Sequence, residues 1–162
     1  MIILWWKRNT KGEGQIIRRQ QICLTPKEQA LHILENNMIG TLATVQQDKP
    51  HSRYMTFFHD EFILYTVTSK KTHKVEEAAN NPHTHILLGY DGKGLGDSYL
   101  EIEGMIEQSD DPMMKEKVWN DALKGWFDGP DDPDLIVLKI TPTQIRLMNT
   151  KGKDPQLVDF TN

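Results

Sequence analysis

Short β-prone runs separated by turn signals recur along most of this chain and restrict the folds that it can form. The runs rich in β-branched, aromatic and aliphatic residues are 39–45, 52–58, 62–67, 84–90, 99–107, 135–140 and 144–148. Residues 46–50 are expected to join the first two runs as a hairpin, and the glycine-rich residues 91–97 to join the fourth and fifth. Strands joined by short links pair antiparallel, so the sequence predicts a mainly β protein, a closed or split barrel with inserted helices.

Three helices are expected between these runs. The first has a capping box with proline at its first position, Thr25-Pro26-Lys27-Glu28, and its apolar stripe continues to about Asn37. A second is expected to begin at Ser69 and to end before Asn81-Pro82. A third, opened by Asp110-Asp111-Pro112, is expected to continue as far as Trp126.

Two cations stand at the expected start of the second helix, where cations are unfavourable. The first turn of a helix carries positive partial charge from its unpaired N–H groups, so Lys70 and Lys71 would cost a few tenths of a kcal/mol each. An anion bound at this helix start would make the two lysines favourable. It would accept hydrogen bonds from the free N–H groups, from the two ammonium groups and from the hydroxyls of Thr68, Ser69 and Thr72. The sequence thus indicates a phosphate site, the alternative being two solvated lysines beside an ordinary N-cap.

Composition limits the remaining classes. The chain has 162 residues and a net charge of −4, with its basic residues spread among acidic ones, which disfavours nucleic acid as a partner. We expect an N-terminal arm at 1–24, one split-barrel domain at 25–150 and a polar C-terminal tail at 151–162. Cys23 is the only cysteine and no run approaches membrane-spanning length, so the expected location is the cytoplasm, with no membrane partner.

Two other chemistries are not supported by spacing. His83-Thr84-His85 places two imidazoles on one strand face, but no third ligand stands nearby, so no metal is expected. The glycines of residues 89–96 do not form a dinucleotide-binding fingerprint between a strand and a helix.

Several short motifs together resemble the pyridoxamine 5′-phosphate oxidase-like superfamily of FMN-binding split barrels. They occur in the expected order as Arg53-Tyr54-Met55-Thr56, Tyr65-Thr66, Ser69-Lys70-Lys71 and Asn81-Pro82. Residues 126–133, Trp-Phe-Asp-Gly-Pro-Asp-Asp-Pro, are similar to a loop of the general stress protein 26 group of that superfamily. The resemblance extends over about residues 26–147.

The resemblance implies a six- or seven-stranded Greek-key barrel that forms a homodimer, with FMN, or FAD as the alternative, between the subunits. It further implies a flavin-dependent oxidoreductase that transfers hydride or electrons to a small acceptor. The alternatives are a non-catalytic flavin sensor or storage module and a haem or deazaflavin binder. By the same resemblance, the residues that contact the cofactor are Arg53, Met55, Thr56, Tyr65, Thr66, Ser69, Lys70, Lys71, Trp126 and Phe127.

Some of these residues also have purely structural interpretations. Arg53 could pair with a nearby carboxylate, Tyr65 could be a barrel-rim group, and Trp126 with Phe127 could anchor a helix end in the core. The chain also departs from true pyridoxamine phosphate oxidases, since Phe58 stands where they carry a substrate-binding lysine. Its last residues lack their substrate-binding arginine and histidine, so pyridoxal phosphate synthesis itself is not expected.

Overall fold

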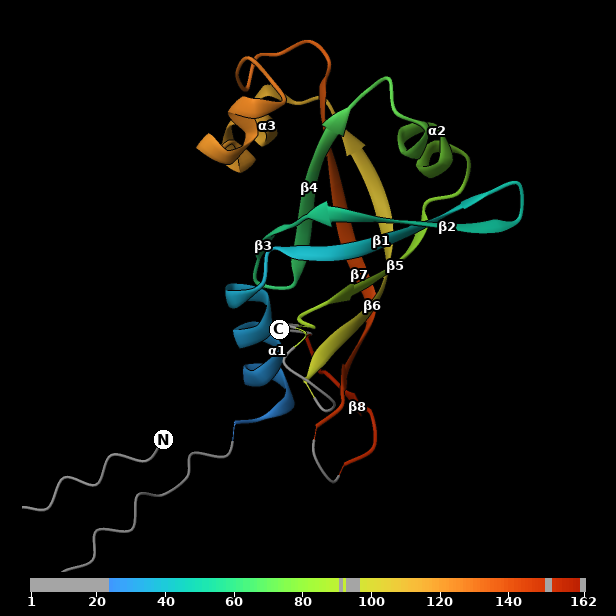
Figure 1. Cartoon of the computed structure of the whole chain (residues 1–162), viewed down its shortest axis with the longest axis vertical. Helices are drawn as coiled ribbons and strands as arrows, with labels where there is room; N and C mark the ends of the chain where they lie inside the picture. Colours follow the sequence, from blue (N-terminus) through green and yellow to red (C-terminus); the bar gives the residue numbers. More distant parts are fainter. Residues whose placement is uncertain (1–23, 91, 93–96, 151–152, 161–162) are drawn as a thin grey trace, which may run out of the picture.

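One curled antiparallel sheet carries the fold in the computed structural model, which describes residues 24–90, 92, 97–150 and 153–160. In spatial order the strands are β2-β1-β5-β6-β7-β4-β3, and β8 pairs with β7. In chain order they are β1 (Ile39–Gln46), β2 (Lys49–Thr56), β3 (Phe58–Asp60), β4 (Ile63–Ser69), β5 (His83–Leu88), β6 (Tyr99–Ser109), β7 (Leu135–Met148) and β8 (Gln156–Leu157). In Figure 1 the β1–β2 hairpin runs across the direction of β4, β6 and β7, as in half of a barrel. The mainly β prediction is confirmed.

The strand count differs slightly from the expected six or seven. The described residues form eight strands, because two very short ones, β3 with three residues and β8 with two, join the six long strands. Residues 153–160 therefore do more than form a polar tail: Val158 is 4% exposed and belongs to the main core. The predicted arm at 1–24 lies outside the described residues except for Leu24.

Helices cover both ends of the sheet. They are α1 (Pro26–Asn36), α2 (His73–Asn80), α3 (Pro112–Val118) and the 3₁₀ helix η1 (Asp121–Gly125). Figure 1 shows α2 and α3 flanking the end of β4, whereas α1 lies at the other end of the sheet. The main core lies between α1, α2 and the sheet, and a second cluster of Tyr65, Val67, Val118, Leu123, Leu135 and Val137 lies beneath α3 and η1. No helix among the described residues is long and apolar enough to span a bilayer.

One of the expected turns is shorter than predicted, and another is absent. Gln47 and Asp48 alone turn the first hairpin, both with positive φ, so β2 begins at Lys49 and includes Pro50. Proline is tolerated there because β2 is an edge strand. The predicted break at residues 141–143 is also absent, because Thr143 forms a bulge within β7: the consecutive residues Glu103 and Gly104 of β6 pair with Gln144 and Pro142 on either side of it.

Two helices begin or end elsewhere than predicted. The helix predicted from Ser69 begins at His73, because the Lys70 N–H donates to the Asp134 carbonyl (2.8 Å) and extends the β4–β7 pairing. The long helix predicted to Trp126 is divided at Asn120, whose extended backbone and side chain cap a separate 3₁₀ helix.

The capping box of α1 is present as predicted and provides a stability test. Thr25 Oγ1 accepts from the Glu28 N–H (3.2 Å), and Glu28 Oε2 accepts from the Thr25 N–H (2.7 Å). Thr25→Ala is expected to lower the free energy of unfolding by about 1 kcal/mol, because a helix N–H loses its acceptor. Urea unfolding measures this, with Thr25→Ser as the control that keeps the hydroxyl. Equal losses in the two variants would contradict the capping role.

Candidate functional site

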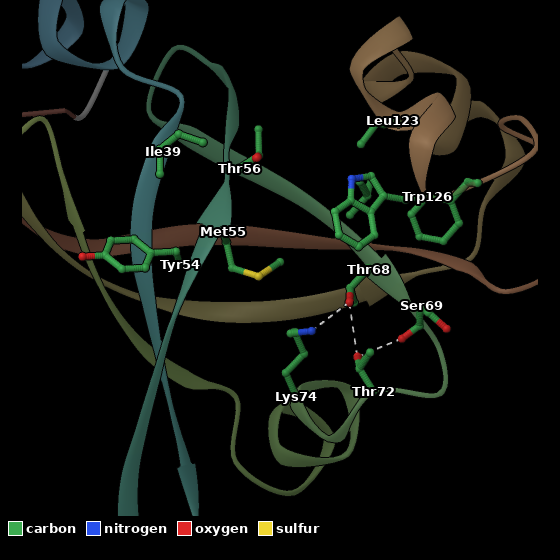
Figure 2. Close-up of a pocket in the computed structure, with 12 residues that line it drawn as sticks. Ile39, Tyr54, Met55, Thr56, Thr68, Ser69, Thr72, Lys74, Leu123 and Trp126 are labelled. Atoms are coloured by element: carbon green, nitrogen blue, oxygen red, sulfur yellow. Dashed lines mark hydrogen bonds between the residues drawn. The ribbon is translucent and has the colours of Figure 1, made fainter.

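A pocket of about 470 Å³ lies where β1, β2, β4, α2 and the segment after α3 meet (Figure 2). Its lining residues are Ile39, Tyr54, Met55, Thr56, Val67, Thr68, Ser69, Thr72, Lys74, Leu123, Trp126 and Phe127. Five of the predicted cofactor residues are among them, namely Met55, Thr56, Ser69, Trp126 and Phe127. The curl of the sheet thus brings the motif of β2, the end of β4 and the loop after η1 to one place.

One side of the pocket is polar. The Lys74 Nζ donates to Thr68 Oγ1 (3.0 Å), which also lies 3.2 Å from Thr72 Oγ1. Thr72 Oγ1 in turn donates to the Ser69 carbonyl (2.8 Å). Figure 2 shows these groups on one side and the Met55 thioether and Trp126 ring on the other. An ammonium and three hydroxyl-bearing residues therefore face an apolar, aromatic wall.

Lys74 is an incompletely paired cation. Burial lowers the pKa of its ammonium, the positive charge of Arg53 lowers it further, and Glu77 acts in the opposite direction. Within the part of the chain that the structure describes, Thr68 is its hydrogen-bond partner and no carboxylate reaches ion-pair distance. A half-buried ammonium of this kind favours an incoming anion.

Lys70 and Lys71 lie elsewhere than predicted. Both are in the turn before α2 rather than in its first turn, and neither lines the pocket. The Lys70 Nζ pairs with Asp110 Oδ2 (2.7 Å) and the Lys71 Nζ with Asp134 Oδ2 (2.5 Å). The hydrogen bond to Asp134 raises the pKa of Lys71. The Asp110 and Asp134 carboxylates are both exposed to solvent, but the Lys70 side chain is only 34% exposed, so solvent weakens the Lys71 pair more than the Lys70 pair.

Sequence reasoning missed Lys74 because the predicted helix began too early. With a helix starting at His73, the cation of the first turn is Lys74, and Thr72 stands at the N-cap position without a side-chain cap bond. The usable signal was the Thr72-His73-Lys74 run itself, since threonine favours an N-cap more than a helix interior.

Arg53 pairs with a carboxylate, the structural alternative stated above. The Arg53 Nη2 donates to Glu77 Oε2 (2.7 Å), and Nη1 donates to Thr44 Oγ1 (2.5 Å). His51 Nδ1 lies 2.8 Å from Glu77 Oε1. Burial alone would raise the pKa of the Glu77 carboxyl, but hydrogen bonds from Thr44, His51 and Arg53 outweigh it and lower the pKa to about 2. Arg53 therefore pairs with Glu77 and is not among the residues that line the pocket.

Tyr65 and Thr66 are buried in β4 and do not line the pocket. Tyr65 packs in the cluster beneath α3, with the Lys117 Nζ 5.1 Å from its ring centroid. Thr66 Oγ1 is buried without a hydrogen-bond partner in the described part of the chain.

Trp126 and Phe127 differ from each other, since Phe127 packs against the cluster beneath α3 whereas the Trp126 side chain is 82% exposed. The core-anchor interpretation therefore fits Phe127 alone.

An apolar surface adjoins the pocket. Ile39 and Tyr54 also line a second hollow of about 340 Å³, together with Leu87, Tyr90 and Tyr99 among others. Tyr54 is 79% exposed and Tyr90 66% exposed, high values for large apolar side chains that gather around one hollow. No group of three or more metal-ligating side chains was found within the described residues.

The family model for pyridoxamine 5′-phosphate oxidase matches residues 26–149, and the chain belongs to this family of split barrels. Within it, the chain is 54% identical over 129 residues to General stress protein 26 of Bacillus subtilis (strain 168), covering 80% of this chain and 92% of the relative. The crystal structure of General Stress Protein 26 from Bacillus anthracis str. Sterne superposes with a TM-score of 0.72 at 36% identity, covering 82% of this chain and 98% of that one.

More distant solved structures share the fold alone. One is described as a FAD-binding protein from Mesorhizobium loti, with a TM-score of 0.61 at 19% identity over 72% of this chain and 89% of that chain. Another is a heme binding protein from Mycobacterium smegmatis, with a TM-score of 0.68 at 17% identity over 83% of this chain and 58% of that chain.

Proposed function

We propose that this chain is a cytoplasmic, FMN-dependent oxidoreductase of the pyridoxamine 5′-phosphate oxidase family that transfers hydride or electrons to a small acceptor. The observation that supports this most is the position of Lys74 among the hydroxyls of Thr68, Ser69 and Thr72. These groups suit the phosphate end of FMN, because a phosphate supplies the charge that the ammonium lacks and accepts hydrogen bonds from hydroxyls.

The apolar side of the pocket suits a flavin ring. Met55, Leu123 and Trp126 offer a thioether, an aliphatic chain and an indole to a planar ligand. A bound flavin would itself supply the redox chemistry, while these residues would orient it and keep water away from one face. The described residues show no histidine facing the pocket, so its lining supports FMN over haem ligated by an imidazole.

The exposed apolar surface supports a homodimer as the working form. A second copy that covers Ile39, Tyr54 and Tyr90 would bury apolar side chains and close the pocket on the side that Ile39 and Tyr54 share with the second hollow. The flavin would then lie between subunits, with Trp126 near the partner. Light scattering with and without FMN tests this arrangement.

The first test is the visible absorption of the purified full chain, followed by identification of any flavin released on denaturation. FMN at about one per chain is expected, and NAD(P)H oxidation with a panel of acceptors then tests turnover. Reaction with oxygen alone, and slowly, would favour the non-catalytic sensor or storage role. Protein that stays colourless and takes up no added FMN would contradict the proposal.

Lys70 and Lys71 remain proposed phosphate ligands through exchange of partners. An arriving phosphate would compete with Asp110 and Asp134 for the two ammonium groups, and both of these carboxylates are exposed to solvent. The double variant Lys70→Ala, Lys71→Ala is expected to weaken FMN binding while riboflavin, which has no phosphate, binds as before. Unchanged FMN affinity would remove both lysines from the site.

A further inference from the structure

The second hollow continues the cofactor pocket along β1, β5 and the start of β6. Ile39 and Tyr54 line both spaces. Figure 2 shows the Tyr54 ring directed away from Lys74 and Trp126, which lie at the other end of the pocket. The volume of about 340 Å³ is in the range of small-molecule sites. A ligand in the second hollow would therefore be a direct neighbour of a ligand held in the pocket.

Charge is nearly absent from the walls of these two spaces. Of the described residues, only Lys74 carries a charge in the lining of the pocket or of the second hollow. The proposed function assigns Lys74 to the phosphate end of the flavin, so an acceptor would meet side chains without charge. An anionic acceptor would lose its hydration there without gaining a partner. The lining therefore favours an uncharged acceptor.

Charged side chains beside the second hollow also disfavour an anion. Glu101 stands directly opposite Leu87, a lining residue, in the β5–β6 pairing. The Arg146 side chain donates to Glu101 (3.0 Å) and to Glu103 (2.9 Å), so one cation serves two carboxylates. The three side chains together are therefore negative. An incoming anion would be repelled by this excess and would find Arg146 already paired.

The walls of the second hollow are aromatic and aliphatic. Tyr54, Tyr90 and Tyr99 are among its lining residues, and the first two are largely exposed, so their ring faces are available to a ligand. Each phenol hydroxyl can donate a hydrogen bond to a carbonyl oxygen. Ile39 and Leu87 add aliphatic side chains. Such a space suits a flat ring system that carries carbonyl oxygens.

A second copy of the chain would not change this character. A twofold interface brings the same patch from each subunit. The patch proposed above to meet its counterpart contains Ile39, Tyr54 and Tyr90, none of which carries a charge. The partner subunit would thus cover the hollow with more uncharged and largely aromatic surface.

We propose that the electron acceptor is an uncharged quinone, which binds in the second hollow beside the flavin and against Tyr54, Tyr90 and Tyr99. This inference rests on the proposed function, because it names the acceptor of that reaction. The quinone would receive a hydride from the reduced flavin and a proton from solvent, to which the flavin releases one. The quinone is thereby reduced to a hydroquinone and the flavin is oxidised. With a reduced nicotinamide as donor, a hydride and a proton restore the reduced flavin.

The first measurement is equilibrium dialysis of naphthoquinone and of naphthoquinone sulfonate against the oxidised, FMN-loaded full chain. Oxidised flavin does not reduce a quinone, so binding is measured without turnover. Only quinone that dialysis removes again is counted, which leaves out any that has added to a thiol. Naphthoquinone is expected to bind at about one per chain, and the sulfonate about tenfold more weakly. Tyr90→Ala should weaken naphthoquinone about fivefold and leave FMN bound, because Tyr90 lies outside the cofactor pocket.

A cation placed in the second hollow should favour the anionic probe. Tyr90→Lys is expected to raise the affinity for the sulfonate, relative to that for naphthoquinone, about tenfold over Tyr90→Met. Comparing the two variants cancels the intrinsic difference between the probes. Met113→Lys, at an exposed position outside both linings, should leave the relative affinity unchanged. Leu87→Lys against Leu87→Met repeats the comparison if Tyr90→Lys does not fold, and light scattering shows whether each variant keeps the wild-type mass.

The outcomes distinguish this inference from the proposed function. Wild-type protein that takes up no FMN overturns both. FMN-loaded protein that oxidises NAD(P)H with other acceptors, but binds naphthoquinone no better than its sulfonate, overturns only the quinone assignment. Naphthoquinone binding that neither Tyr90→Ala nor the lysine variants of the hollow alter overturns its placement there. An effect of Met113→Lys as large as that of Tyr90→Lys would show a general effect of net charge and would overturn the placement as well.

Discussion

Replacing Lys74 with methionine is expected to weaken FMN binding by about ten- to a hundredfold. A hydrogen bond between charged groups contributes about 1.5–3 kcal/mol, which corresponds to that range of affinity. Among the described residues, Lys74 reaches the pocket with a hydroxyl and no carboxylate as its partner, so its charge is available to a ligand. Methionine keeps most of the aliphatic chain and removes the ammonium. Quenching of flavin fluorescence on titration at low salt measures the effect.

The matched control is Lys49→Met, which removes the same charge from an exposed position at the start of β2. Its FMN affinity should equal that of the wild type. Riboflavin should bind Lys74→Met and wild type alike, because the lost contact is to phosphate. If Lys74→Met binds FMN as tightly as the control does, the anionic end of the ligand lies elsewhere, and the Lys70 and Lys71 double variant then shows whether the preceding turn holds it.

Elements specified by neighbouring residues were predictable from the sequence. The capping box Thr25 to Glu28 joins residues three apart, and α1 begins where it predicts. The β5–β6 pair likewise follows alternating patterns joined by a glycine-rich link, and its register from His83 to Leu88 is regular. Local chemistry decides such elements, so one sequence suffices to locate them.

Boundaries that depend on distant partners were not predictable in the same way. α2 begins at His73 because the Lys70 N–H bonds to Asp134, far along the chain. β7 continues through Pro142 because a bulge at Thr143 lets the strand keep its pairing with Glu103 and Gly104 of β6. In each case a tertiary contact overrides a turn signal that would be decisive in isolation.

The candidate site likewise contains residues whose position the sequence predicted and residues whose position depends on distant contacts. Met55, Thr56 and Ser69 were predicted and do line the pocket, because strand ends place them there. For Arg53 the sequence could indicate a nearby carboxylate as partner but could not identify it as Glu77, because packing determines which face of α2 lies toward β2. The role of every residue toward a cofactor remains a prediction for the binding experiments.

Acid should remove a large part of the stability that Glu77 provides. Its folded pKa of about 2 lies below the ordinary value of 4.5, so the ionised form is favoured by folding. A lowered carboxyl pKa contributes stability that is complete above about pH 5 and is lost as the pH falls toward 2. The difference between the folded and the ordinary pKa corresponds to about 3 kcal/mol in the free energy of unfolding. Urea unfolding of the wild type at several pH values between 7 and 2 measures the total loss.

The contribution of Glu77 to this loss is obtained from the difference in free energy of unfolding between the wild type and Glu77→Gln. At pH 7 the variant should be about 3 kcal/mol less stable, because Arg53 loses its buried partner. The two proteins should converge near pH 2, where the wild-type carboxyl is also protonated. Glu107→Gln serves as the control, since that carboxylate is 70% exposed and its pair with Lys139 should add little. A constant gap between wild type and Glu77→Gln from pH 7 to pH 2 would mean that shape, rather than charge, is what Glu77 contributes to the fold.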